Sequence, residues 1–190
     1  MKFASKLVLA TAGLAAVSAC SSEMSEDEQA IYDARVAEEE AKPTNLTALV
    51  QEIPELSTAS TMVGFSGIAA ELKDDGPFTS FVGNNDAFAK IDSAELDALV
   101  TPERKDDLVA IAKFGLVKGS MTTEGLAKAI TDGDGTASLT TLQGGTIKAS
   151  MDGDKIVLED AAGNKAGIVQ ADIESSNGTM HILDTVLMPG

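Results

Sequence analysis

Apolar positions follow a helical spacing in the first half of the main globular part of the chain. Leu46, Leu49, Val50 and Ile53 stand at i, i+3, i+4 and i+7, which predicts a helix that stops near Pro54. A second helix is predicted from Ser57 to Leu72, and its apolar face is made of Met62, Phe65, Ile68, Ala69 and Leu72. Further helices are predicted over residues 93–100, 102–114 and 121–130.

The pattern changes to an alternation of period two in the second half. Strands are predicted over residues 138–142, 146–151, 155–158 and 166–173, with Asp152-Gly153 as a hairpin turn. Ile147, Ala149 and Met151 share one face of the second of these strands. A single earlier strand is predicted over residues 78–82, before Asn84-Asn85-Asp86, which can cap a helix.

The last predicted strand lies within residues 177–189. It opens with Asn177-Gly178, the dipeptide typical of a type I′ hairpin turn. Along it, Met180 and Ile182 alternate with His181 and Leu183. Because both sets of side chains are bulky, we expect a strand that is mostly buried on two faces, around which the domain packs.

Two stretches of the chain resemble the signatures of the fasciclin (FAS1) domain family. The residues that carry the resemblance are Phe78, Thr79, Phe81, Asn85 and Phe88 in the first stretch, and Asn177, Gly178, His181, Asp184 and Pro189 in the second. Val82-Gly83 replaces the usual Ala-Pro of the first signature, and Thr179 takes an apolar place of the second. The resemblance implies a fasciclin-like α+β domain over residues 44–190, a two-sheet β-wedge with flanking N-terminal helices, in which these ten residues are structural.

One family motif is missing. In animal members, a Tyr-His pair ahead of a Val-x-Gly sequence is linked to integrin-type adhesion, and here Phe114-Gly115 stands in its place. That particular activity is therefore not carried over to this chain.

Residues 1–20 are typical of a bacterial lipoprotein signal peptide. Lys2 and Lys6 precede a run of apolar and small residues from Leu7 to Ala19. This run of about 13 residues is shorter than the roughly 20 that span a bilayer. Val17-Ser18-Ala19-Cys20 resembles a lipobox, and Cys20 is the single cysteine of the chain. We expect Cys20 to be acylated and to become the N-terminus; the alternative is an ordinary signal peptide cut near Ala19.

An acidic segment separates this cysteine from the domain. Residues 21–43 are poor in large apolar groups and end at Pro43, and we interpret them as a partly helical tether. Ser21-Ser22 carry no acidic retention signal, which favours an outer-membrane location. The net charge of −16 argues against nucleic acid as a partner, since binding phosphates needs a basic surface.

Candidate catalytic and metal-binding patterns are weak. His181, the one histidine, could be imagined with Asp184 and Ser176 as a triad, but a strand would turn Asp184 to the opposite face, and we expect a buried, hydrogen-bonded histidine. Residues 132–136 resemble the start of a calcium loop. Ala137 and Gln143, however, occupy the sixth and twelfth positions, where an EF-hand needs Gly and Glu, so we expect a turn. No catalytic residue, metal or cofactor is predicted.

These patterns lead to two functional hypotheses. The first is a non-enzymatic, membrane-anchored lipoprotein that acts as an adhesion or interaction module of the cell envelope, with an unknown protein or surface as its partner. The second is a binding protein for a small hydrophobic ligand such as a carotenoid or lipid. In that case methionines together with Phe65, Phe78, Phe81 and Phe114 would line an apolar groove.

Overall fold

The computed structural model describes residues 44–72 and 76–190. Its helices are α2 (Leu46–Glu52), α3 (Ser57–Ser66), α4 (Asn85–Phe88), α5 (Ser93–Leu99), α6 (Lys105–Phe114) and α7 (Thr123–Asp132), with 3-10 turns at Pro54–Leu56, Ile68–Ala70 and Pro102–Arg104. Its strands are β1 (Phe78–Gly83), β2 (Leu116–Lys118), β3 (Thr136–Thr140), β4 (Thr146–Asp152), β5 (Lys155–Glu159), β6 (Lys165–Ser175) and β7 (Gly178–Leu183). Helices come first and most strands last, as the periodicity predicts. Within the described ranges, none of these helices has the length and apolar character needed to cross a membrane.

The seven strands follow one another in the single order β2-β1-β7-β6-β5-β4-β3. All neighbours are antiparallel except β1 and β7, which run parallel from Phe78 beside Gly178 to Gly83 beside Leu183. At the two ends of this order, Val117 of β2 forms an isolated bridge to Thr141, just after β3. The strands therefore form a nearly closed, barrel-like wedge, and the expected division into two sheets is not confirmed.

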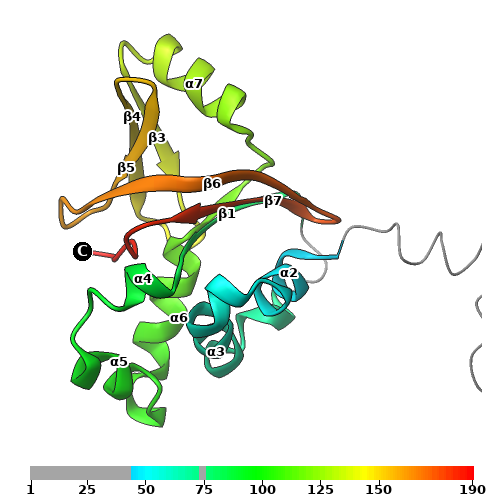
Figure 1. Ribbon diagram of the computed structural model, residues 1–190, viewed down its shortest axis with the longest axis vertical. Coiled ribbons are helices and arrows are strands. Elements are labelled where there is room, and N and C mark those ends of the chain that lie inside the picture. Colours follow the sequence, from blue (N-terminus) through cyan, green and yellow to red (C-terminus); the bar gives the residue numbers. More distant parts are fainter. Residues whose placement is uncertain (1–43, 73–75) are drawn as a thin grey trace, which may run out of the picture. The chain divides into compact units, whose positions relative to one another are not determined.

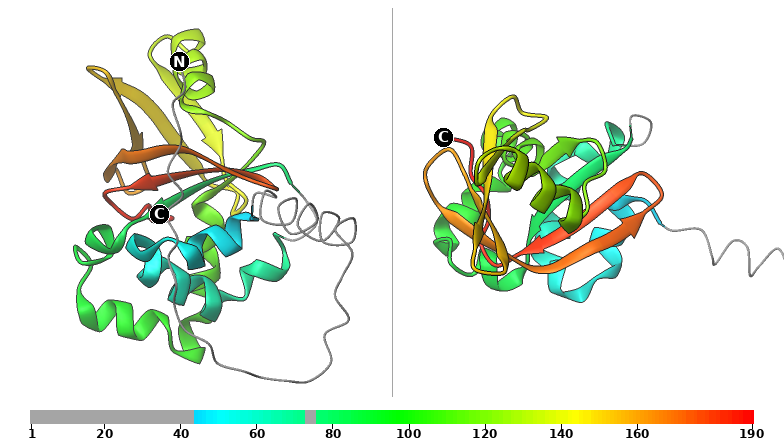
Figure 2. Two further views of the ribbon diagram at one scale, coloured as in Figure 1. Left: turned by 45° about the vertical axis from the view of Figure 1, so that its right-hand side comes forward. Right: turned by 90° about the horizontal axis from the view of Figure 1, so that it is seen from above.

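Helices cover this wedge on two sides. Helices α2 to α6 lie below β1 and β7, and α7 lies at the other end, over β3, β4 and β5 (Figure 1). The left view of Figure 2 shows the same separation from another direction. Two cores result. One fills the wedge and includes Phe81, Leu183 and Leu126 of α7. The other lies between the sheet and the helical layer and includes Met180 and Ile182.

Strands β1 and β7 belong to both cores. Along β7, Thr179, His181 and Leu183 alternate with Met180 and Ile182, and all five are buried. The prediction of a central strand buried on two faces is thus confirmed. The strand is shorter than predicted, because it ends at Leu183, and residues 184–190 leave the sheet as an irregular segment.

The second predicted helix is also shorter than expected. It stops at Ser66 because Gly67 adopts a left-handed conformation (φ 73°) and caps it, after which the chain makes the 3-10 turn at Ile68–Ala70. Phe65, placed on the apolar face by periodicity, is 54% exposed. Ile68 and Leu72 are buried nonetheless, since the chain changes direction after Gly67.

One turn prediction differs from the structure. Ser175 pairs with Gly178, so Ser176 and Asn177 form the loop between β6 and β7, and Asn177 lacks the positive φ that a type I′ turn requires. Met151 shares the face of Ile147 and Ala149, as predicted, but is 43% exposed at the end of β4, next to the hairpin turn.

Candidate functional site

The signature residues of the two stretches meet where β1 and β7 lie side by side. His181 is fully buried and stacks on Phe81, with ring centroids 5.4 Å apart. Its Nε2 lies 2.8 Å from the carbonyl oxygen of Met121, and its Nδ1 lies 3.3 Å from the amide nitrogen of Asp172. Since an amide can only donate, Nδ1 accepts and Nε2–H donates, which is the neutral form of the ring.

Burial lowers the pKa of His181, and it outweighs the opposite effects of the Met121 carbonyl and of the Asp172 charge. Both ring nitrogens are occupied within the protein. The imidazole is thus held neutral and has no free lone pair for a metal ion or a substrate proton.

Thr79 connects the same strands to the loop before α7. Its hydroxyl donates to the carbonyl of Gly119 (2.6 Å) and accepts from the amide of Met121 (2.9 Å). Ser120 of this loop lies 2.6 Å from Thr179, oxygen to oxygen. His181 and Thr79 together fix the loop of residues 119–121 against the sheet.

Asp172 extends this network to α7. It stands at an irregularity of β6, between Gln170 and Ile173, with a φ of 57°. Its carboxylate accepts hydrogen bonds from the amide (2.7 Å) and the hydroxyl of Thr123, the first residue of α7. Desolvation raises the pKa of Asp172, but the two hydrogen bonds from Thr123 outweigh it, so the pKa of this carboxyl lies below its usual range.

Asn177 and Gly178 hold the β6–β7 turn against the helices. The amide group of Asn177 accepts from the backbone of Leu46 and donates to the carbonyl of Leu72, both at 2.8 Å. A Cβ on Gly178 would lie 1.9 Å from the carbonyl oxygen of Phe78. The Asn-Gly dipeptide therefore serves a close approach of two strands rather than the predicted turn type.

The other signature residues also lie at joints of the fold. Asn85 accepts from the Thr58 amide (3.0 Å) and donates to the Pro54 carbonyl (3.1 Å), which joins α4 to the start of α3. Phe78 and Phe88 are buried in the core below the sheet. Pro189 is partly buried in the C-terminal segment.

The imagined triad is not assembled. Asp184 lies just beyond the end of β7, and its carboxylate accepts from the Gly167 amide (2.9 Å) and the Thr185 hydroxyl (2.9 Å). Ser176 lies in the β6–β7 turn, where its amide bonds to the carbonyl of Thr44. Neither side chain is hydrogen-bonded to His181, whose two nitrogens face Met121 and Asp172.

The calcium-like segment is a turn between α7 and β3, with Asp134 and Gly135 at positive φ. Across residues 44–72 and 76–190, no cluster of three or more His, Cys, Asp or Glu side chains is arranged to hold a metal ion.

A carboxylate that the sequence analysis did not single out holds the C-terminal segment. Asp160, buried after β5, accepts from the amides of Ala162 and Asn164, the side chain of Asn164 and the amide of Met188. Desolvation raises its pKa, but these hydrogen bonds outweigh it, so the pKa of Asp160 is lowered. The run Asp160-Ala-Ala-Gly-Asn164 carries a recognisable Asx-turn signal, whereas the bond to Met188, 28 positions away, does not show in the sequence.

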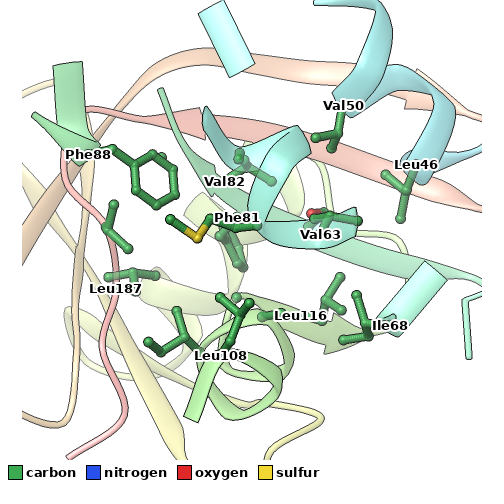
Figure 3. A pocket seen from close by; sticks show the side chains of 18 of the residues that line it. Leu46, Val50, Val63, Ile68, Phe81, Val82, Phe88, Leu108, Leu116 and Leu187 are labelled. Carbon is green, nitrogen blue, oxygen red and sulfur yellow. The ribbon is translucent and has the colours of Figure 1, made fainter. Parts of the chain in front are cut away.

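An apolar cavity of about 100 Å³ lies between the sheet and the helical layer. Its walls come from α2, α3, β1, α6 and the C-terminal segment, and side chains such as Val63, Phe88, Leu108 and Leu187 point into it (Figure 3). Of the four phenylalanines predicted to line an apolar groove, only Phe81 lines this cavity. Phe78 and Phe114 are packed in the cores, and Phe65 points to solvent.

Residues 54–189 match the family model of the fasciclin domain. The chain belongs to the fasciclin family. It is 32% identical over 133 residues to the protein sll1483 of Synechocystis, a match that covers 70% of this chain and 67% of that protein. It is 28% identical to human periostin over 77% of this chain, which corresponds to only 16% of periostin. The matched region is thus a small part of that much larger relative.

Two further similarities are to a cell surface protein and to a solved structure. The chain is 30% identical to the cell surface glycolipoprotein MPB83 of Mycobacterium bovis, over 60% of this chain and 44% of MPB83. The FAS1 domain pair of the insect cell adhesion molecule fasciclin I superposes with a TM-score of 0.54 at 17% sequence identity, covering 68% of this chain and 43% of that one. The latter similarity shows the fold alone.

Proposed function

We propose that this protein is a fasciclin-type interaction module of the cell envelope, anchored through lipidated Cys20 and without enzymatic activity. Family membership carries the proposal. Relatives include periostin and a protein whose name describes a cell surface glycolipoprotein, MPB83. Cys20 and the acidic tether lie outside the described residues, so the anchor rests on the sequence pattern of residues 1–20.

The geometry of the signature residues supports a structural rather than a chemical role for them. His181 uses both ring nitrogens, one on the Asp172 amide and one on the Met121 carbonyl. The Thr79 hydroxyl bonds to the backbone of Gly119 and Met121 in the loop before α7. In the described part of the chain, every buried side-chain nitrogen and oxygen has a hydrogen-bond partner. The buried polar atoms of His181 and Thr79 are therefore used within the fold, which supports a structural role for these two residues.

The anchor is tested by mass spectrometry of the protein purified from the membranes of its source cells. We expect a mature N-terminus at Cys20 that carries more than one acyl chain, since a single chain holds a protein only weakly on a membrane. A Cys20→Ala variant should lose the acyl mass, and a Ser21→Ala variant should keep it. Recovery of the mature protein entirely in the soluble fraction, with Cys20 unmodified, would overturn the anchored part of the proposal.

The interaction role is tested by attachment. Cells that lack the protein should lose attachment to one another or to a surface, and the wild-type gene, but not Cys20→Ala, should restore it. Unchanged attachment in the deletion strain would contradict the role.

The apolar cavity supports a second candidate function, the binding of a hydrophobic ligand. An absorption spectrum and lipid mass spectrometry of the native protein test it directly. A stoichiometric pigment or lipid, beyond the acyl chains of Cys20, would favour this function. The volume of about 100 Å³ is well below the roughly 300–1,000 Å³ of ordinary ligand pockets, so a whole carotenoid would not fit without rearrangement.

A further inference from the structure

The cavity between the sheet and the helical layer has the chemistry of a site for an uncharged apolar group. None of the described side chains that line it is charged, and only Thr47 and Ser80 bring hydroxyls to it. The protein has a net charge of −16, yet the wall of this cavity is uncharged. It can therefore accept a hydrocarbon or a noble gas, but it offers no partner for a charged group.

The volume limits the occupant. A cavity lined by Leu, Ile and Phe of about 150 Å³ is known to stay dry and to bind benzene or xenon. At about 100 Å³, with a similar lining, this cavity is large enough for a few carbon atoms and gives water too few polar partners. A ring of benzene size or the end of one alkyl chain is the upper limit for the cavity as it stands.

The rim of the cavity can yield to an incoming group. Met62, Ile91, Ile111 and Met188 line it and are partly exposed, and methionine side chains are the most adaptable of apolar groups. Met188 belongs to the irregular segment after β7. Its amide donates one hydrogen bond to the Asp160 carboxylate (3.0 Å). Entry therefore requires the displacement of side chains and a short segment, and no strand has to open.

We propose that this cavity is a binding site for a small apolar group, either a free molecule no larger than benzene or the terminal carbons of a single alkyl chain. This narrows the second candidate function to a much smaller ligand than a carotenoid. It is independent of the anchor at Cys20, so either proposal can fail without the other.

The test uses the full chain with Cys20→Ser, which cannot be acylated, in detergent-free buffer, with benzene as the probe. We expect a saturable rise of Tm by a few degrees, because a ligand that binds only the folded state stabilises it. In ¹³C-methyl spectra, Met62 and Met188 should shift with benzene concentration, and Met151, on the far β4–β5 hairpin, should not.

A pair of variants assigns the effect to the cavity. Ala112→Leu adds bulk at a partly buried lining position of α6, and Ala129→Leu adds the same bulk at a partly buried position of α7 outside the cavity. The first should abolish the benzene response, and the second should keep it. If Ala112→Leu lowers the Tm without ligand, its circular dichroism spectrum shows whether the fold is kept. Ala59→Val fills the cavity from α3 instead and provides an independent test.

A series of straight-chain alcohols from propanol to decanol shows whether the bound apolar group is a free small molecule or the end of an alkyl chain. Each methylene that enters the cavity should tighten binding about fourfold. Loss of binding beyond a few carbons indicates a site for a free small molecule, and a plateau that long chains retain indicates that the terminal carbons of an alkyl chain enter through the rim. Affinity that keeps rising up to decanol would contradict the size limit set by the cavity. Absence of saturable benzene binding, or binding that survives Ala112→Leu and Ala59→Val, would overturn the proposal.

Discussion

Burial, together with the hydrogen bond that Nδ1 accepts, keeps His181 neutral. Nδ1 faces the amide of Asp172, so a second ring proton would bring two donors together in a fully buried place. The residue thus favours folding only while it remains unprotonated. Asp172, which provides that amide, has a left-handed backbone (φ 57°), a conformation that aspartate tolerates better than most residues.

This leads to a prediction about pH. Because the pKa of His181 is lowered by folding, the unfolded chain binds the proton more readily near and below pH 6.5. We therefore expect the free energy of unfolding to have its highest value above about pH 7. It should fall between pH 7 and 5.5, by up to about 1.4 kcal/mol per pH unit. Urea titrations at successive pH values measure it.

His181→Gln provides the control for this prediction, since His181 is the one histidine of the chain. The variant should be less stable by about 1–3 kcal/mol, because one or both buried partners lose a hydrogen bond. Its stability should be nearly flat over pH 7 to 5.5, above the range where carboxylates titrate. An equal slope in both proteins would show that His181 is not the group that titrates.

At the scale of elements, the parallel pairing of β1 and β7 organises the domain. They are the first and the last strand along the described chain, and both carry apolar side chains on two faces. Where Phe78 lies beside Gly178, the Phe78 carbonyl occupies the space that a side chain at position 178 would need. A glycine is needed at this point because of the neighbouring strand.

Gly178→Ala should therefore be severely destabilising. A Cβ at 1.9 Å from the Phe78 carbonyl oxygen cannot be relieved by a side-chain rotation, so the strands must separate. We expect a loss of at least about 3 kcal/mol or failure to fold, measured by urea denaturation followed by circular dichroism. The matched control is Gly64→Ala in α3, where nothing lies within 4 Å of the new Cβ and helix propensity predicts a gain of roughly 0.5–1 kcal/mol. Similar stability of the two variants would contradict this account of Gly178.

At the scale of the whole domain, the two cores share β1 and β7. Phe81 and Leu183 face the core inside the wedge, and Met180 and Ile182 face the core beside the helices. Loss of either core removes the packing from one face of both strands. The domain should therefore unfold as one unit although its apolar residues form two clusters.

Methionine methyl groups provide reporters for this cooperativity. Met121 packs against the core inside the wedge, and Met180 is buried in the core beside the helices. In a urea titration followed by ¹³C-methyl spectra, we expect both signals to change with the same midpoint and the same slope. Separate midpoints would show that one core survives the loss of the other.

The family matched to residues 54–189 agrees with the one that the two signatures indicated, and the predicted order of helices and strands is close to the observed one. Such features are local. Spacing of apolar residues, capping residues and turn dipeptides depend on neighbours within a few positions. The main local error, the helix extended past Gly67, arose because apolar periodicity continues beyond a glycine that ends the helix.

The sequence by itself determined the class of fold, the family and a central strand buried on both faces. It also provides the expectation that the chain is anchored to a membrane through Cys20. Tertiary structure decided what the signature residues do. The pairing of His181 with Asp172 and Met121, the need for Gly178 beside Phe78, and the bond from Asp160 to Met188 all join residues that only folding brings together. The apolar cavity belongs to the same class, because its walls come from segments between Leu46 and Met188 whose packing no local pattern specifies.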